Sequence, residues 1–190
     1  YSISNTSATT TAAITAKSLT ASYTANDKTY DGTTSATVVG SLNSVVSGDT
    51  VTLANTSATF ADKNVGTGKT VTISGLSLGG TDAGNYTLSS TSTTTTAAIT
   101  AKSLTASYTA SDKTYDGSRT ATVSASSSDI VTGDAVTISH SSATFADKNV
   151  GTGKTVSISG ISLSGTDAGN YSLASTSASA SAAISAKSIT

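Results

Sequence analysis

The chain has 190 residues with ten basic and eleven acidic side chains and a formal net charge of −1, so it lacks the basic surface that nucleic-acid binding requires. It contains no Cys, so no disulfide and no Cys-ligated metal can stabilise it, and no apolar run approaches the ~20 residues of a membrane-spanning helix. Ser and Thr account for 76 residues, and Val, Ile and Leu alternate with them. Because Thr, Val, Ile and Tyr favour extended backbone, the composition predicts an all-β protein.

A repeat of 85 residues organises the sequence. Residues 60–71 recur without change at residues 145–156, and 59 of the 85 aligned positions are identical. A period of 85 exceeds the ~20–50 residues of one solenoid coil, and it suits a small independent β-domain. The expected segments are the C-terminal strand of a preceding repeat (1–16), two complete repeats (17–101 and 102–186) and the start of a further repeat (187–190).

Turn signals divide each repeat into about seven short strands, the pattern of an immunoglobulin-like sandwich. In chain order, the expected strands of the first repeat contain Leu19, Ala21 and Tyr23; Val38; Val51 and Leu53; Val71 and Ile73; Tyr86 and Leu88; and a Thr-rich segment that ends at Ile99. The turns between them fall at Asp31–Gly32, Ser47–Asp49, Asp62–Gly68 and Gly79–Asn85. A small β-barrel is the alternative architecture.

The junction between the two repeats contains no Gly or Pro. Residues 99–105 are therefore expected to run as β-structure from one repeat into the next, with limited freedom to bend. The sequence thus predicts tandem immunoglobulin-like β-sandwich modules in an elongated, monomeric array, in which each repeat has its neighbouring repeats as partners.

Two stretches of the first repeat resemble a particular feature of immunoglobulin-like domains. Residues 69–78, followed by residues 82–88, are similar to the E strand and the tyrosine corner, in which a Tyr near the start of strand F bonds back to upstream backbone. The resemblance implies a structural role for Tyr86 and for its equivalent, Tyr171.

Four motifs together closely resemble the YDG repeat domain: residues 28–32, 60–69, 82–86 and 99–102. YDG repeats belong with the mostly bacterial immunoglobulin-like (MBG-type) domains of very large Gram-negative exoproteins, including filamentous-haemagglutinin-like adhesins. The resemblance implies an extracellular location on the bacterial surface, as part of an outer-membrane-associated exoprotein. It implies no catalytic or ligand-binding residues.

The repeat also helps to judge candidate catalytic and cofactor-binding residues. The sole His, His140, is replaced by Asn55 in the first repeat, so a His-based site cannot belong to the module. Residues 66–70 imitate a phosphate-binding loop, but Lys63 stands where that motif needs Gly, and an alternating strand follows instead of a helix. We therefore expect no enzyme activity, no catalytic residues and no bound cofactor.

Asp residues in loops offer the remaining candidates for a ligand site. Asp27 and Asp31, with their equivalents Asp112 and Asp116, flank a Lys-Thr-Tyr turn near the start of each repeat. Calcium takes six to eight oxygen ligands, often from several carboxylates, which makes these four residues calcium candidates. Asp beside Gly or Asn is also ordinary turn chemistry, and this is the favoured interpretation.

Two functional hypotheses follow. The leading one is a structural spacer or stalk of a secreted bacterial surface adhesin, which projects a binding region from the cell for adhesion or biofilm formation. Host glycans or biofilm matrix would then be bound through other regions of the adhesin. The alternative is a carbohydrate- or matrix-binding module with repeated weak sites, which would display exposed aromatic rings at equivalent positions in both repeats. Tyr30 and Tyr115, at the start of a turn, are candidates for such stacking or for packing.

Overall fold

The computed structural model describes Tyr1 and residues 7–189. Residues 2–6 and 190, at the outer ends of the two flanking segments expected from the sequence, lie outside the described residues. The all-β prediction is confirmed, because the described elements are strands and two single-turn 3₁₀ helices, η1 (Ala83–Asn85) and η2 (Ala168–Asn170). No helix in the described part of the chain has the length and apolar character to cross a membrane.

The chain divides into two compact units that do not coincide with the two repeats. Unit 1 consists of Tyr1–Asn26, Ser35–Ala61 and Thr70–Thr96. Unit 2 consists of Asp27–Thr34, Asp62–Lys69 and Ala97–Thr190. Unit 2 therefore contains the whole second repeat together with two loop regions and the last residues of the first repeat.

Each repeat contains more strands than the expected seven. The strands of the first repeat are β1 (Lys17–Ala25), β2 (Lys28–Thr29), β3 (Val38–Asn43), β4 (Thr52–Ala54), β5 (Ser57–Phe60), β6 (Gly66–Ser74), β7 (Ser77–Gly79), β8 (Tyr86–Leu88) and β9 (Ser92–Thr100). The strands of the second are β10 (Lys102–Leu104), β11 (Ser107–Ala110), β12 (Lys113–Thr114), β13 (Val123–Ser126), β14 (Thr137–Ser139), β15 (Ser142–Phe145), β16 (Gly151–Ser159), β17 (Ser162–Ser164), β18 (Tyr171–Leu173) and β19 (Ser177–Ser185).

One difference between the repeats comes from a single side chain. The single strand β1 corresponds to two strands, β10 and β11, in the second repeat. At the break, the backbone N–H of Thr105 donates to the Asp129 carboxylate at 2.8 Å, and the first repeat has Ser44 in place of Asp129. A side-chain acceptor thus takes a donor that could otherwise bond to a neighbouring strand.

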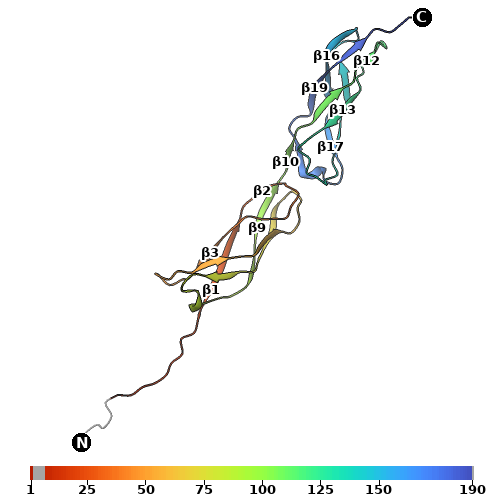
Figure 1. Ribbon diagram of the computed structural model, residues 1–190. Coiled ribbons are helices and arrows are strands. Elements are labelled where there is room, and N and C mark those ends of the chain that lie inside the picture. The colour runs from red at the N-terminus through yellow and green to blue at the C-terminus, as the bar shows by residue number, and fades with distance from the viewer. Residues whose placement is uncertain (2–6, 190) are drawn as a thin grey trace. The chain divides into compact units, whose positions relative to one another are not determined.

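In unit 1, β1 is the centre of a sheet with the order β3-β1-β8, and Figure 1 shows β1 beside β3. β1 pairs antiparallel with β3 over six residues and parallel with β8 over three. β4 pairs antiparallel with β7, and β5 pairs antiparallel with β6. The parallel pair places Tyr86, the first residue of β8, opposite Lys17.

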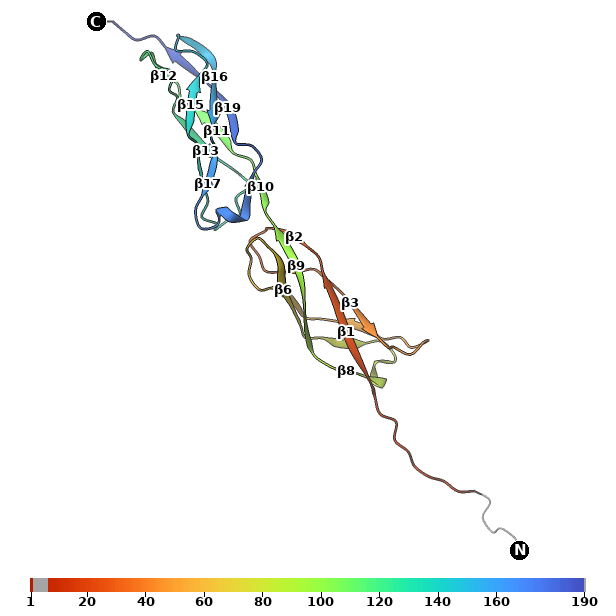
Figure 2. The same cartoon turned by 180° about the vertical axis from the view of Figure 1, so that it is seen from behind.

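In unit 2, the largest sheet has the order β12-β19-β16-β15, and Figure 2 shows β16 beside β19. β16 and β19 pair antiparallel, with a register shift between Gly151 and Lys154. Smaller pairs are β10 with β18, β11 with β13 and β14 with β17. The strand structure expected over residues 99–105 ends at Leu104 and is interrupted at Ala101.

The core of unit 2 follows from alternation along its longest strands. Val156 and Ile158 on β16 are buried while their neighbours Thr155 and Ser157 are exposed, as expected for a strand with one face in the core. The core cluster comprises Ala121, Ala143, Phe145, Val156, Ile158, Ile161, Ala182 and Ile184. Three of its members are Ala, and its one aromatic ring, Phe145, is the largest side chain whose apolar area folding buries there.

Phe145→Ala is expected to lower the free energy of unfolding by about 3–5 kcal/mol, because it leaves a cavity in a small core. The control is Val39→Ala, since Val39 is 63% exposed on β3, and it should change stability by less than about 1 kcal/mol. Urea unfolding followed by circular dichroism measures both variants. Equal effects would contradict the assignment of Phe145 to the core.

Candidate functional site

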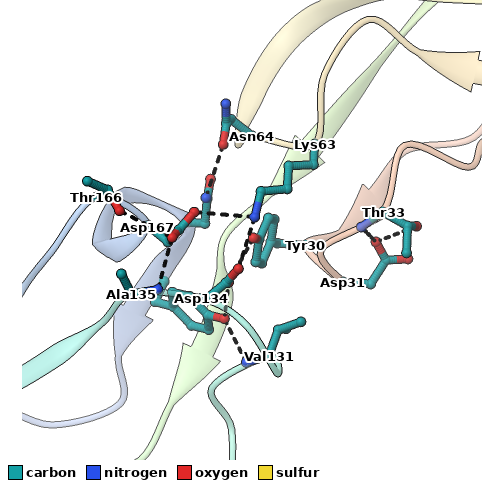
Figure 3. A network of polar contacts seen from close by, with 12 residues as sticks. Tyr30, Asp31, Thr33, Lys63, Asn64, Val131, Asp134, Ala135, Thr166 and Asp167 are labelled. Atoms are coloured by element: carbon teal, nitrogen blue, oxygen red, sulfur yellow. Dashed lines mark hydrogen bonds and ion pairs between the residues drawn. The ribbon is translucent and has the colours of Figure 1, made fainter.

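Asp134 is a buried carboxylate in unit 2 that accepts hydrogen bonds from three side chains (Figure 3). Its side chain is only 3% exposed. Oδ2 accepts from the hydroxyls of Tyr171 at 2.6 Å and Tyr30 at 2.8 Å, and Oδ1 accepts from Lys63 Nζ at 2.9 Å. The rings of Tyr30 and Tyr171 pack edge to face, with centroids 5.5 Å apart. Asp134 and Tyr171 belong to the second repeat, whereas Tyr30 and Lys63 belong to segments of the first repeat that lie within unit 2.

A tight turn holds Asp134 in place. Its backbone N–H donates to the carbonyl of Val131 at 3.0 Å, and Gly133 within the turn has φ +95°, which favours glycine. The N–H of Val131 donates to the Tyr171 hydroxyl at 2.8 Å. The Tyr171 hydroxyl is therefore used fully, as a donor to the carboxylate and as an acceptor from the turn.

The loop after β2 positions Tyr30. β2 pairs parallel with the end of β9, and the next N–H, that of Tyr30, donates to the carbonyl of Thr100 at 2.8 Å. Asp31 then closes an Asx turn, because its Oδ1 accepts from the N–H of Thr33 at 2.8 Å. These bonds leave the Tyr30 ring buried, at 2% exposure.

The loop between β5 and β6 positions Lys63. Asp62 Oδ1 accepts from the N–H of Asn64 at 2.8 Å and from Lys69 Nζ at 2.7 Å, which fixes the loop on both sides of Lys63. Lys63 Nζ lies 3.3 Å from Asp167 Oδ1 as well as beside Asp134 (Figure 3). Its side chain remains 37% exposed, so this ammonium group reaches the two carboxylates from the solvent side.

Asn170 makes a second, uncharged contact with the same loop. Its Oδ1 accepts from the N–H of Val65 at 2.9 Å, and its Nδ2 donates to Asn64 Oδ1 at 3.2 Å. Asn170 is 4% exposed, and both ends of its amide are satisfied. A buried amide with both ends bonded fixes the position of the loop that it contacts.

The pKa shifts at this site reflect burial and hydrogen bonding. Burial alone would raise the pKa of Asp134, but the bonds from Tyr171, Lys63 and Tyr30 outweigh it and hold that pKa below its ordinary value. The hydrogen bond to Asp134 is the main cause of a raised pKa at Lys63. Burial, followed by the bond to Asp134, raises the pKa of Tyr171 to about 12. At neutral pH Asp134 is therefore a carboxylate and Lys63 an ammonium group, and the raised pKa of Tyr30 and Tyr171 keeps both phenols neutral.

The same corner in the first repeat has fewer partners. In unit 1, the Tyr86 hydroxyl donates to Asp49 Oδ2 at 2.5 Å and accepts from the N–H of Val46 at 3.1 Å. Among the described residues, no ion pair reaches Asp49, and its carboxylate accepts a side-chain hydrogen bond from Tyr86 alone. Tyr86 and Tyr171, which the sequence singles out, thus make equivalent bonds to backbone 40 residues upstream.

The four Asp residues considered for calcium all accept hydrogen bonds from elsewhere in the protein. Asp27 and Asp112 each accept from the N–H of an Ala 71 residues downstream at 2.6 Å. Asp31 and Asp116 each accept from the Lys three residues before and from the N–H two residues after, and these bonds, led by that from Lys113, lower the pKa of Asp116 to about 2. Over Tyr1 and residues 7–189, no three His, Cys, Asp or Glu side chains gather in a group that could hold a metal ion.

The phosphate-loop-like stretch and His140, both considered in the sequence, have ordinary structural roles. The stretch that imitates a phosphate-binding loop, residues 66–70, lies inside β6, so no helix N-terminus follows it. β6 begins at Gly66, which places the end of the expected loop 62–68 inside a strand. His140 packs edge to face on Tyr108, with ring centroids 5.6 Å apart.

No motif in the sequence marks Lys63, Asp134, Asp167 and Asn170 as interacting residues. All four types recur at equivalent positions in the two repeats, which marks them as belonging to the module. Their pairing has no sequence signal, because the partners lie in separate loops whose proximity depends on the fold.

Asp134→Asn should lower the stability of unit 2 by about 2 kcal/mol more than Asp49→Asn lowers that of unit 1. Both variants weaken a Tyr–carboxylate bond, but only Asp134→Asn removes the charge that Lys63 and Tyr30 contact. Hydrogen exchange resolved by segment measures the two units separately. Equal losses would contradict the role given to Lys63 and Tyr30.

Acid should destabilise the site through Asp134. Its pKa in the folded state lies below the unfolded value of about 3.9, so its contribution is present above that value and is lost as the pH falls through the folded pKa. Between about pH 5 and pH 2, unit 2 should therefore lose less stability in Asp134→Asn than in the parent. Urea unfolding at a series of pH values measures this difference, and parallel pH profiles would contradict it.

Comparison with known proteins agrees with the resemblance seen in the sequence. A model of the YDG domain matches residues 5–96 and 100–178. Searches of curated proteins and of solved structures gave no match. The two matched segments cover most of the 190 residues, and each begins and ends before the corresponding repeat, 17–101 or 102–186. The chain therefore belongs to the YDG domain family.

Proposed function

We propose that this chain is a structural spacer of a large secreted bacterial surface adhesin, in which tandem immunoglobulin-like repeats project a binding region away from the cell. The observation that carries the proposal is the contact at Asp134. There, a buried carboxylate of the second repeat is bonded by Tyr30 and Lys63 of the first repeat. Repeats that bind one another through defined side-chain contacts suit a part whose task is to hold a shape.

The nature of this contact suits a spacer that carries load. Asp134 is almost completely buried, so its bonds to Tyr30 and Lys63 are charge-assisted and sheltered from competing water. The amide of Asn170 adds a separate contact to the neighbouring loop. Several short polar contacts, each with a fixed direction, restrict rotation between repeats more than apolar packing alone would.

The Tyr corner supports the immunoglobulin-like part of the proposal. In both repeats a Tyr that follows a 3₁₀ turn bonds through its hydroxyl to a backbone N–H 40 residues upstream. In immunoglobulin-like domains a Tyr at this place likewise bonds to upstream backbone. Here an Asp at the end of the upstream turn adds a second bond to each hydroxyl.

The positions of the aromatic rings favour the spacer over the glycan-binding alternative. A repeated sugar site would expose equivalent rings in both repeats. Phe60 and Phe145 are buried, as are Tyr86 and Tyr171, and Tyr30 is buried where Tyr115 is partly exposed. Tyr23 and Tyr108 are the equivalent pair that is partly exposed in both repeats, and neither ring is fully exposed. A positive signal for this chain on a glycan array would favour the alternative.

Small-angle scattering of the two-repeat chain tests the proposal. We expect one elongated conformation with restricted bending, and a compact globule or a freely jointed pair would contradict it. The double variant Tyr30→Phe, Lys63→Ala should scatter as a more flexible chain, because Asp134 loses both donors from the first repeat.

The matched control for scattering is the double variant Tyr115→Phe, Lys148→Ala. These residues are the equivalents of Tyr30 and Lys63 in the second repeat, and neither makes a hydrogen bond or ion pair through its side chain among the described residues. The control should scatter like the parent. Equal flexibility in the two double variants would show that the Asp134 contact does not restrict bending.

A further inference from the structure

We propose that each repeat carries two complementary docking half-sites, and that the two halves left free in this chain bind further copies of the same repeat. The donor half, in the contact that is made, consists of Tyr30, Lys63, Asn64 and Val65. Its free copy consists of the equivalent residues Tyr115, Lys148, Asn149 and Val150. The acceptor half, in the contact that is made, consists of Val131, Asp134, Asp167, Asn170 and Tyr171. Its free copy consists of the equivalent residues Val46, Asp49, Asp82, Asn85 and Tyr86. The proposal rests on the contact within unit 2 and is independent of a location on the cell surface.

The free acceptor half has the right groups with spare bonding capacity. Asp49 is bonded by Tyr86, whereas its equivalent Asp134 accepts two further donors. Asp82 uses its Oδ2 for the N–H of Thr50, as Asp167 does for Ala135, and no ion pair to Asp82 occurs in the described part of the chain. Oδ1 of Asp82 thus remains available to a Lys, as Oδ1 of Asp167 is to Lys63.

Exposure marks the same face as uncovered. Asn85 is exposed, whereas its equivalent Asn170 is 4% exposed. Val46 is 49% exposed, and its equivalent Val131 is partly buried. A hollow of about 170 Å³ lies beside Asn85, lined also by Gly84 and residues 14–16.

The free donor half shows the matching pattern. Lys148 and Asn149 are exposed, and Val150 is 55% exposed where its equivalent Val65 is partly buried. Tyr115 is partly exposed, whereas Tyr30 is buried. Tyr115, Asn149 and Val150 line one hollow of about 710 Å³ together with residues 186–189. These side chains therefore stand together on one face, as their equivalents do where the contact is made.

A glycine gives an independent sign of the same contact. A Cβ built on Gly32 would lie 2.8 Å from Val131 Cγ1, so this loop approaches the acceptor turn closely. Gly117, the equivalent of Gly32, has nearly the same φ, +78° against +79°, but meets nothing within 4 Å. The backbone of the loop is thus the same in both repeats, and only the neighbour differs.

The partner that fits both halves is another copy of this repeat. The acceptor half offers two carboxylates and an amide, and the donor half offers an ammonium group, a phenol and a backbone N–H beside an amide oxygen. In the one contact that is made, groups of the two halves meet at 2.8–3.3 Å. The corner Tyr–Asp bond of the acceptor half is kept there. A contact of this small size binds weakly between separate chains and becomes effective when the repeats are linked in tandem.

The test uses two copies of the chain fused in repeat register, with residues 1–186 followed by residues 17–190. Because the chain has no Cys, a disulfide can form only between the two Cys residues that are introduced, and its formation reports the contact between those two positions. Asn149→Cys in the first copy is combined with Asn85→Cys in the second copy. The positive control is the unfused chain with Asn64→Cys and Asn170→Cys, whose native side chains contact each other at 3.2 Å. The matched negative control replaces Asn85→Cys with Thr72→Cys, at an exposed position on β6.

Disulfide formation in a glutathione buffer is followed by mass spectrometry. We expect the Asn149→Cys, Asn85→Cys pair to close roughly tenfold faster than the Thr72→Cys control, because docking raises the effective concentration of the two thiols. Adding Asp49→Asn to the second copy should slow closure toward the control rate. Closure no faster than in the Thr72→Cys control, or closure unaffected by Asp49→Asn, would overturn the proposal.

Discussion

Burying the Asp134 carboxylate is the constraint on which the contact site depends. A buried carboxylate is costly unless donors surround it, since its loss of hydration must be offset by hydrogen bonds. The chain supplies these donors from Tyr171, Tyr30 and Lys63, which lie in three separate segments. Each segment must therefore stand in its observed place for the others to be stable, and the site acts as one unit instead of three independent bonds.

Within this network, Tyr171 bonds to Asp134 inside the second repeat, whereas Tyr30 bonds to it from the first repeat. Unit 1 contains the same Tyr–Asp bond, between Tyr86 and Asp49, without donors from elsewhere. The acceptor corner is therefore already formed before docking, and docking adds donors to a carboxylate whose position is fixed. Such preorganisation reduces the entropy that binding must overcome, which matters for a contact with few bonds.

Periodicity and composition predicted the features of this fold that depend on local sequence. The all-β class arises from alternation and composition, and the 85-residue repeat arises from comparison of the two copies. The structural role expected for Tyr86 and Tyr171 came from a resemblance to the tyrosine corner of immunoglobulin-like domains. The pairing of Lys63 with Asp134, 71 residues apart, could not be predicted in this way. Both residues recur in both repeats, and only the packing of loops decides that the Lys of one repeat meets the Asp of the next. The strand break at Thr105 could not be predicted from local sequence either, because it depends on one non-local acceptor, Asp129.

The polar character of the half-sites follows from the need to stay soluble when uncovered. An apolar face at each end of a repeat would be a site of non-specific association wherever no neighbour covers it. Asp49 and Asp82 of one half-site are partly exposed and Lys148 of the other is exposed, so all three charges keep contact with water in that state. Their hydration must be removed on docking, so the contact gains little raw affinity, but it admits only a partner with complementary charges in the matching positions. Tandem linkage supplies the local concentration that weak polar half-sites lack, which makes the covalent repeat and the polar contact mutually dependent parts of one design.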